Sequence, residues 1–253
     1  MLIRQAIAVP PFRVWFSGRL HISNLVNKPW PARFFELQVR RVAVTADREP
    51  LFHAPPAALI LAVTILGGYL LQSRGLVTQD LSRWGYSAAN LANGHPETLV
   101  AALFLHGGWP HALMNAGMGL AFATPIARYL GSDARGLATF LVYYLICGAL
   151  ANYGYGLLHP DSPGVLIGAS GAVSALAAGT ARIVGGRGQV GPILSPIVVG
   201  MGGAWLIVNL LTAILGFAPG AEGAQVAWEV HLIGFVLGLF LIPLAGWFTA
   251  PKA

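Results

Sequence analysis

Residues 167–172 read Ile-Gly-Ala-Ser-Gly-Ala, which sets one hydroxyl group, that of Ser170, among small residues in a long apolar run. A hydroxyl inside lipid usually bonds to its own helix, and small residues usually mark close helix packing. A second stretch, residues 230–238, favours a chemical role instead. It reads Val-His-Leu-Ile-Gly-Phe-Val-Leu-Gly, so His231 begins another apolar helix and shares one face with two glycines. A serine and a histidine on two such faces can come into contact.

The composition around these stretches is that of a membrane protein. Of the 253 residues, 56% are hydrophobic and 9% are charged, whereas soluble domains are roughly one-quarter charged. The fold class is therefore an all-α polytopic membrane protein. The single cysteine, Cys147, excludes an internal disulfide and a cysteine metal site. Eight of the fifteen Lys and Arg residues precede residue 50, so a membrane-proximal basic segment explains the net charge of +6 better than nucleic acid binding does.

Residues 1–50 hold those eight basic residues, four prolines before residue 32, and no apolar run long enough to cross a membrane. We expect a basic, partly disordered cytoplasmic arm, followed by a six-helix domain over residues 51–253. Pro10, Pro11 and Arg13 interrupt the apolar core that a signal peptide needs. Since no acidic residue precedes Glu36, an organellar transit peptide and a gene start placed too far upstream stay open as alternatives.

Six stretches have the length of about 20 largely apolar residues that a spanning helix requires. They cover residues 54–71, 110–129, 136–158, 165–183, 192–217 and 226–248, and residues 72–109 form a long first loop. Basic residues are more numerous on one side of these spans, so the positive-inside rule predicts that both termini are cytoplasmic. His111, Ser170 and His231 then lie near the outer face at similar depth. We expect a multi-pass protein of the bacterial inner membrane.

Two polar residues of the second predicted span, His111 and Asn115, are spaced i, i+4 and share one helical face. Polar side chains inside a membrane face the bundle interior and are functional candidates by default. The structural alternative is that the pair bonds internally or across helices. Acyl transfer needs donors aimed at the developing oxyanion, and this pair can supply N–H groups beside the backbone N–H of Ser170.

Small residues form a stripe on the fourth and on the sixth predicted span, and such stripes let helix backbones approach closely. The stripes are Gly171-Ala175-Gly179, at i, i+4, i+8, and His231-Gly234-Gly238, at i, i+3, i+7. Close approach is required because a histidine takes a serine proton only across about 2.6–3.2 Å. Glu229 precedes His231 by two residues and should point elsewhere. The sequence therefore predicts a Ser170–His231 dyad without a third residue.

Three motifs follow one another along the chain. They are Phe-Leu-His-Gly-Gly-Trp-Pro-His-Ala-Leu-Met-Asn at 104–115, Gly-Ala-Ser-Gly at 168–171, and His231-x-x-Gly234-x-x-x-Gly238. With these motifs the chain resembles the rhomboid-family intramembrane serine proteases over residues 54–250. The resemblance implies a six-helix bundle, membrane lipid and transmembrane protein substrates as partners, cleavage near the outer membrane face, and no metal or organic cofactor. It assigns Ser170 as nucleophile, His231 as general base and acid, His111 and Asn115 to the oxyanion hole, and structural roles to His106, Gly168, Gly171, Gly234 and Gly238.

Three positions depart from the family pattern. Glu97-Thr98 stands where a Trp-Arg pair is expected, Ala127 where an acidic residue is frequent, and Ser174 where a tyrosine often follows the nucleophile by one turn. These departures weaken predictions about loop anchoring and histidine stacking. They remove no catalytic position.

Other functions explain the pattern less fully. A transporter or channel would also use intramembrane polar residues, but the two halves of the chain show no repeat. A proteolytically silent rhomboid-like adaptor or chaperone would usually lack the serine or the histidine. Zinc and aspartyl intramembrane proteases are disfavoured because no His-Glu-x-x-His motif occurs and all four Asp residues lie outside the predicted spans.

Loop 217–225 is predicted to lift as a lid and admit substrate sideways past the fifth span.

Overall fold

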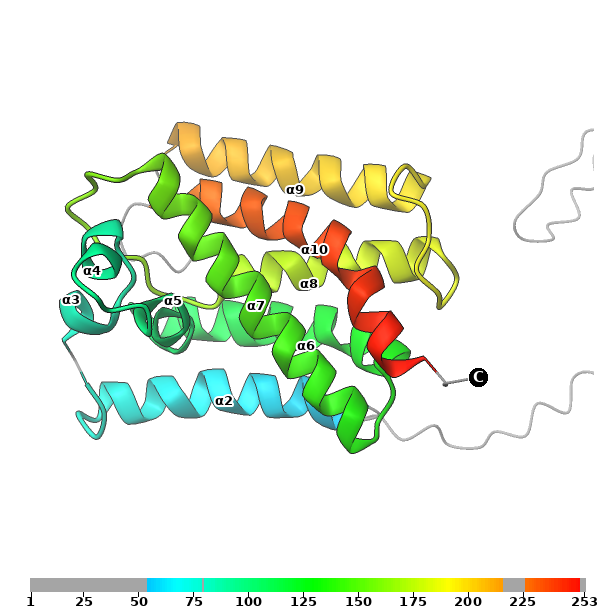
Figure 1. Cartoon of the computed structure of the whole chain (residues 1–253), viewed down its shortest axis with the longest axis horizontal. Coiled ribbons are helices and arrows are strands. Elements are labelled where there is room, and N and C mark those ends of the chain that lie inside the picture. The colour runs from blue at the N-terminus through cyan, green and yellow to red at the C-terminus, as the bar shows by residue number, and fades with distance from the viewer. Residues whose placement is uncertain (1–53, 79, 216–225, 251–253) are drawn as a thin grey trace, which may run out of the picture. The chain divides into compact units, whose positions relative to one another are not determined.

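The structure is a computed structural model that describes residues 54–78, 80–215 and 226–250. Within this part the chain is mainly helical (Figure 1). The long helices are α2 (Pro56–Ser73), α6 (Trp109–Leu130), α7 (Ala134–Leu158), α8 (Ser170–Gly185), α9 (Pro196–Leu215) and α10 (Trp228–Thr249). The predicted arm, residues 1–50, and the predicted lid, 217–225, lie outside the described residues.

A long helix occupies each of the six predicted stretches, but only four meet the criterion of a membrane span. These four, α2, α7, α9 and α10, are long and apolar enough to cross a membrane. In α6 and α8, small and polar residues replace large apolar ones, and α8 has only 16 residues. The described residues therefore support four apolar spans, and the six-span count stays a prediction.

Helix α8 lies at the centre of the bundle, which explains its composition. It contacts α6, α7, α9 and α10, and twelve of its 16 residues are buried. Figure 1 shows α9 on one side of it and α2 with α6 on the other. A helix enclosed by other helices needs small residues that admit close neighbours rather than large apolar ones that face lipid. A criterion based on length and hydropathy therefore misses α8.

The predicted span 165–183 begins too early, because α8 starts at Ser170. Leu166 pairs with Tyr86 in an antiparallel bridge, through N···O distances of 3.0 and 2.7 Å. Two residues later, the Gly168 N–H donates to the carbonyl of Ala102 at 2.8 Å. Gly168 has φ of +113°, a conformation that glycine adopts without steric cost. These bonds to the first loop keep the segment before Ser170 out of the helix.

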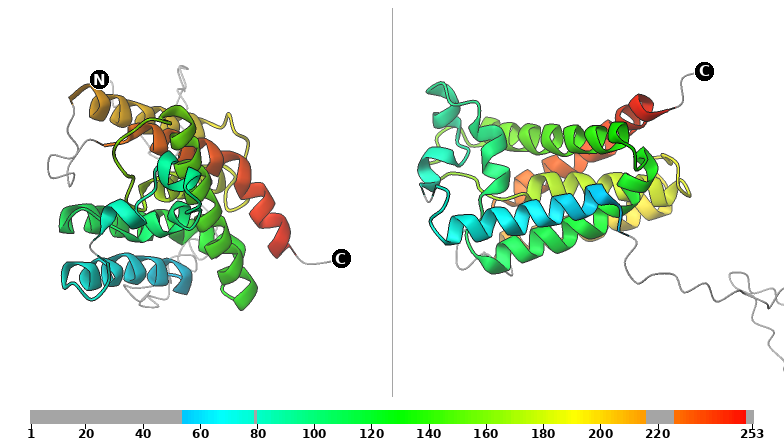
Figure 2. Two further views of the ribbon diagram at one scale, coloured as in Figure 1. Left: turned by 60° about the vertical axis from the view of Figure 1, so that its left-hand side comes forward. Right: turned by 90° about the horizontal axis from the view of Figure 1, so that it is seen from below.

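The predicted first loop, residues 72–109, contains short helices. They are α3 (Leu81–Trp84), α4 (Ala88–Ala92), α5 (Thr98–Ala101) and the 3₁₀-helix η2 (Ala102–Phe104). The Asp80 and Ser87 side chains cap α3 and α4 by accepting from the N–H groups of Arg83 and Asn90. One-turn helices have too few residues to show a period, so the sequence pattern does not reveal them. The helices α3, α4 and α5 gather at one end of the bundle (Figures 1 and 2).

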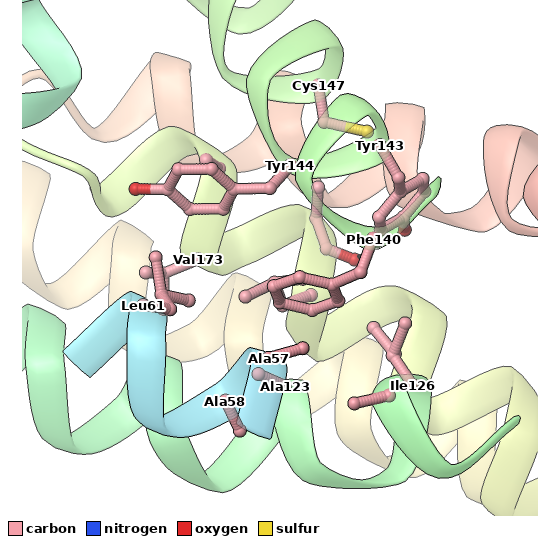
Figure 3. Close-up of a cluster of buried hydrophobic side chains, with 14 of the residues drawn as sticks. Ala57, Ala58, Leu61, Ala123, Ile126, Phe140, Tyr143, Tyr144, Cys147 and Val173 are labelled. Carbon is pink, nitrogen blue, oxygen red and sulfur yellow. Dashed lines mark hydrogen bonds between the residues drawn. The ribbon is translucent and has the colours of Figure 1, made fainter. Parts of the chain in front are cut away.

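A buried apolar cluster joins α2, α6, α7 and α8 (Figure 3). Phe140 and Tyr144 of α7 point into this cluster, beside Leu61 of α2 and Val173 of α8. The Tyr143 hydroxyl lies 3.1 Å from the carbonyl oxygen of Ala175 and 3.3 Å from that of Gly238. Because its one proton is shared between carbonyls of α8 and α10, this side chain connects three helices.

Candidate active site

Ser170 and His231 meet where α8 and α10 begin. Ser170 is the first residue of α8, and His231 lies in the first turn of α10. Figure 1 shows both helix starts at the end of the bundle that carries α3, α4 and α5. His231 Nε2 lies 2.8 Å from Ser170 Oγ. The two atoms are therefore within the range in which a histidine can accept a serine proton.

Two glycines of α10 make this approach possible. A Cβ atom added at Gly234 would overlap the backbone carbonyl of Gly171, and one added at Gly238 would overlap that of Ala175. A Cβ at Gly171 would meet side chains first, at 3.1 Å and beyond. Side chains can shift more easily than a helix backbone. The distance between the serine and the histidine thus depends most on Gly234 and Gly238.

His111 and Asn115 of α6 lie beside the glycine that precedes Ser170 by two residues. A Cβ atom added at Gly168 would lie 2.6 Å from His111 Nε2 and 3.9 Å from Asn115 Nδ2. The Gly107 N–H donates to His111 Nδ1 at 3.4 Å, so Nε2 carries the proton of the neutral ring. The Asn115 amide donates to the His111 carbonyl at 3.1 Å, and its nitrogen bears a second proton. Two nitrogens that bear N–H groups therefore lie close to the same point, beside Gly168.

The sequence of the chain was compared with models of known protein families. A family model described as the Rhomboid domain matches residues 93–248, which is more than half of the chain. The chain belongs to the rhomboid family. Membership agrees with the four apolar helices and makes it an integral membrane protein. A search of curated proteins finds no match.

In this rhomboid a third side chain reaches the histidine. Asn209 Oδ1, from α9, lies 2.8 Å from His231 Nδ1. The expectation that no third residue contacts this histidine was therefore wrong, although Glu229 does point elsewhere, toward His159 Nε2 at 3.2 Å. A signal was present in the sequence. Asn209 and Thr212 are the polar residues inside the apolar run of α9, and intramembrane polar residues are functional candidates.

His106 lies beside His111, in the loop between η2 and α6. The Gln72 side chain holds its backbone, donating to the His106 carbonyl at 2.9 Å and accepting from its N–H at 3.1 Å. Burial, and then the nearby His111, lower the pKa of His106 to about 3, so its ring is neutral at physiological pH. The two histidine rings lie edge to face with centroids 5.0 Å apart.

Among the described residues, no group of three His, Cys, Asp or Glu side chains could hold a metal ion.

The positions that depart from the rhomboid pattern form local contacts of their own. The Ser174 hydroxyl donates to the Ser170 carbonyl at 2.7 Å. In the first loop, Glu97 Oε1 lies 3.0 Å from His95 Nδ1, and the buried Thr98 hydroxyl donates to the His95 carbonyl at 2.7 Å. Glu97-Thr98 therefore fixes the start of α5 through His95.

Proposed function

We propose that this rhomboid is an intramembrane serine endopeptidase that cleaves transmembrane segments of other membrane proteins. The observation that carries the proposal is the 2.8 Å distance between Ser170 Oγ and His231 Nε2 inside the helical bundle. A serine hydroxyl becomes a useful nucleophile when an adjacent base takes its proton. A rhomboid-like adaptor without protease activity has no need of such a contact, so the geometry favours the enzyme.

The proposed reaction has two stages. In the first, His231 Nε2 accepts the hydroxyl proton while Ser170 Oγ attacks the scissile carbonyl carbon, and a tetrahedral oxyanion forms. The imidazolium then gives the proton to the leaving amine, and an acyl-enzyme on Ser170 remains. In the second stage the same nitrogen takes a proton from water as the water oxygen attacks the ester carbon. The tetrahedral intermediate then collapses, the bond to Ser170 Oγ breaks, and the imidazolium returns the proton to Oγ as the carboxylic acid product leaves.

Three N–H groups are the proposed donors to the oxyanion. They are His111 Nε2–H, an N–H of the Asn115 amide, and the backbone N–H of Ser170. The last belongs to the first turn of α8, where backbone N–H groups have no partner within the helix and the helix dipole favours negative charge. Donors already in position stabilise the transition state without reorganising during the reaction.

The proposed membrane arrangement has six spans, both termini in the cytoplasm of a bacterial cell, and the site near the outer face of the inner membrane. The distribution of charge along α8 supports it. Ser170 begins this helix and Arg182 lies in its last turn, where the guanidinium donates to the carbonyls of Gly191 and Leu239. Basic residues mark the cytoplasmic side, so the serine is at the outer end. Residues 1–50 would then form the cytoplasmic arm and 51–253 the catalytic domain.

The proposal is tested by cleavage in proteoliposomes. The purified full chain is mixed with a fluorescent single-span substrate, and a fluorophosphonate probe reports on the reactive serine. We expect wild-type protein to cleave the substrate and take up the probe, and Ser170→Ala to do neither, because it lacks the nucleophile. Ser73→Ala is the matched control, since it removes an exposed hydroxyl at the end of α2. A wild-type protein that neither cleaves nor labels would contradict the proposal and favour the adaptor.

A further inference from the structure

Helix α9 turns one polar side chain toward the protein interior. Of its twenty residues only Val198 and Asn209 are buried, while Ile207, Val208 and their apolar neighbours are exposed. Burying an amide costs free energy unless its polar atoms are hydrogen-bonded. The position of Asn209 is therefore explained by its partners.

Those partners fix which way the amide is turned. Asn209 Nδ2 donates to the backbone carbonyl of Trp205 at 2.8 Å. A carbonyl oxygen can only accept, so the amide nitrogen must face it, and the amide oxygen is left facing His231 Nδ1 at 2.8 Å. The amide oxygen of Asn209 can only accept a hydrogen bond, so His231 Nδ1 must be the donor. The proton of the neutral His231 ring is therefore on Nδ1, and Nε2 presents its lone pair to Ser170 Oγ.

Aromatic packing one turn away holds α9 at this depth. The Trp205 ring stacks on Phe235 of α10 with centroids 6.2 Å apart, and meets Phe122 of α6 edge to face at 6.0 Å. Phe235 lies one turn after His231 on α10, as Trp205 lies one turn before Asn209 on α9. The same pair of helices is thus joined at two levels, by rings and by the amide–imidazole bond.

We propose that Asn209 is a positioning residue that holds His231 in the productive tautomer and orientation, so that the site works as Ser170–His231–Asn209. This inference rests on the proposed protease function. Asn209 exchanges no proton and touches no reacting atom. When His231 becomes an imidazolium, its Nδ1–H donates to Oδ1 as a stronger, charge-assisted bond. The amide therefore stabilises the charged form without placing a second charge in the bundle.

The test compares two substitutions of nearly equal size, Asn209→Leu and Asn209→Asp. Leucine removes the acceptor, while aspartate keeps an oxygen acceptor for His231 Nδ1, loses the N–H that donates to Trp205, and adds a negative charge beside the imidazole. Asn209→Leu leaves the buried His231 Nδ1–H without a partner. We expect this variant to have a kcat lower by roughly 10- to 100-fold. Its KM should stay within about twofold of wild type, because substrate binding does not involve the amide. We expect Asn209→Asp to recover most of the lost kcat. Val208→Ala, at the neighbouring exposed position, is the control for general disturbance of α9.

The outcomes separate this inference from the proposed function. Wild-type kcat in Asn209→Leu would overturn the positioning role while leaving the protease intact, as would equal losses in the leucine and aspartate variants. If leucine lowers the melting temperature in detergent, Asn209→Ala replaces it, because it removes the acceptor without adding a branched side chain. The rate of fluorophosphonate labelling of Ser170 gives an independent readout and should fall in parallel with kcat. Loss of cleavage with unchanged labelling would contradict the proposed role.

Discussion

Adding one methyl group at Gly234 tests whether helix proximity sets the serine–histidine distance. In Gly234→Ala the new Cβ atom would lie inside the van der Waals envelope of the Gly171 carbonyl, and backbone atoms must move to relieve the overlap. Restoring ordinary contact requires α8 and α10 to separate by about 1 Å. The hydrogen bond from Ser170 to His231 is 2.8 Å long, so such a shift takes it beyond its functional range. We expect cleavage to slow by on the order of 10²-fold and the free energy of unfolding to fall by about 1–3 kcal/mol.

The measurements are substrate cleavage in proteoliposomes and thermal unfolding in detergent, with Gly203→Ala as the matched control. A Cβ atom at Gly203, on α9, meets nothing within 4 Å. The same substitution there should leave the rate unchanged and raise stability by about 0.4–1 kcal/mol, because alanine restricts the unfolded chain. Wild-type cleavage by Gly234→Ala would refute the reasoning. An equal loss of rate in Gly203→Ala would show that any added methyl group disturbs the bundle.

Two further substitutions probe the donors on α6. Asn115→Ala should lower kcat by on the order of 10²–10³-fold with little change in KM, since it removes one oxyanion donor, and an unchanged kcat would assign the residue to packing. Gly168→Ala should lower kcat by more than tenfold. The added Cβ atom would lie 2.6 Å from His111 Nε2 and would push the imidazole away, and the φ of +113° disfavours a side chain by about 1–3 kcal/mol. Gly94→Ala, with φ of +86° and nothing within 4 Å, carries only the backbone cost, so equal rates in the two alanine variants would exclude a role for the His111 contact.

The sequence predicts the long helices because each coincides with a largely apolar stretch that can be recognised without its neighbours, although α6 and α8 contain more small and polar residues than the other four. It also singles out the serine and the two histidines, since polar groups stand out in such runs. The start of α8 could not be predicted in the same way. It depends on bonds from residues 166 and 168 to Tyr86 and Ala102, which lie more than sixty residues earlier in the chain. Long-range bonds of this kind leave no period in the sequence.

The role of Asn209 could not be predicted for a related reason. The sequence around His231 offers only residues of the same helix as partners, of which Glu229 is the candidate. The partner lies 22 residues earlier, on a different helix, and the packing of α9 against its neighbours, including Trp205 against Phe235 and Phe122, brings the two side chains together. A polar residue in a lipid-facing helix indicates that something polar faces it, but the sequence does not say what.

The bond between Asn209 and His231 links the proposed catalytic site to a helix with an exposed apolar face. Side chains such as Ile207 and Leu211 expose one face of α9, while the amide on the same helix reaches the histidine. Coupling between two equilibria is reciprocal. A change in bilayer thickness or lateral pressure that tilted α9 would change the position of the Asn209 amide relative to His231, and a ligand that fixed the imidazole would oppose that tilt by the same free energy. For the proposed hydrolase, the surrounding lipid would therefore act as an effector through α9.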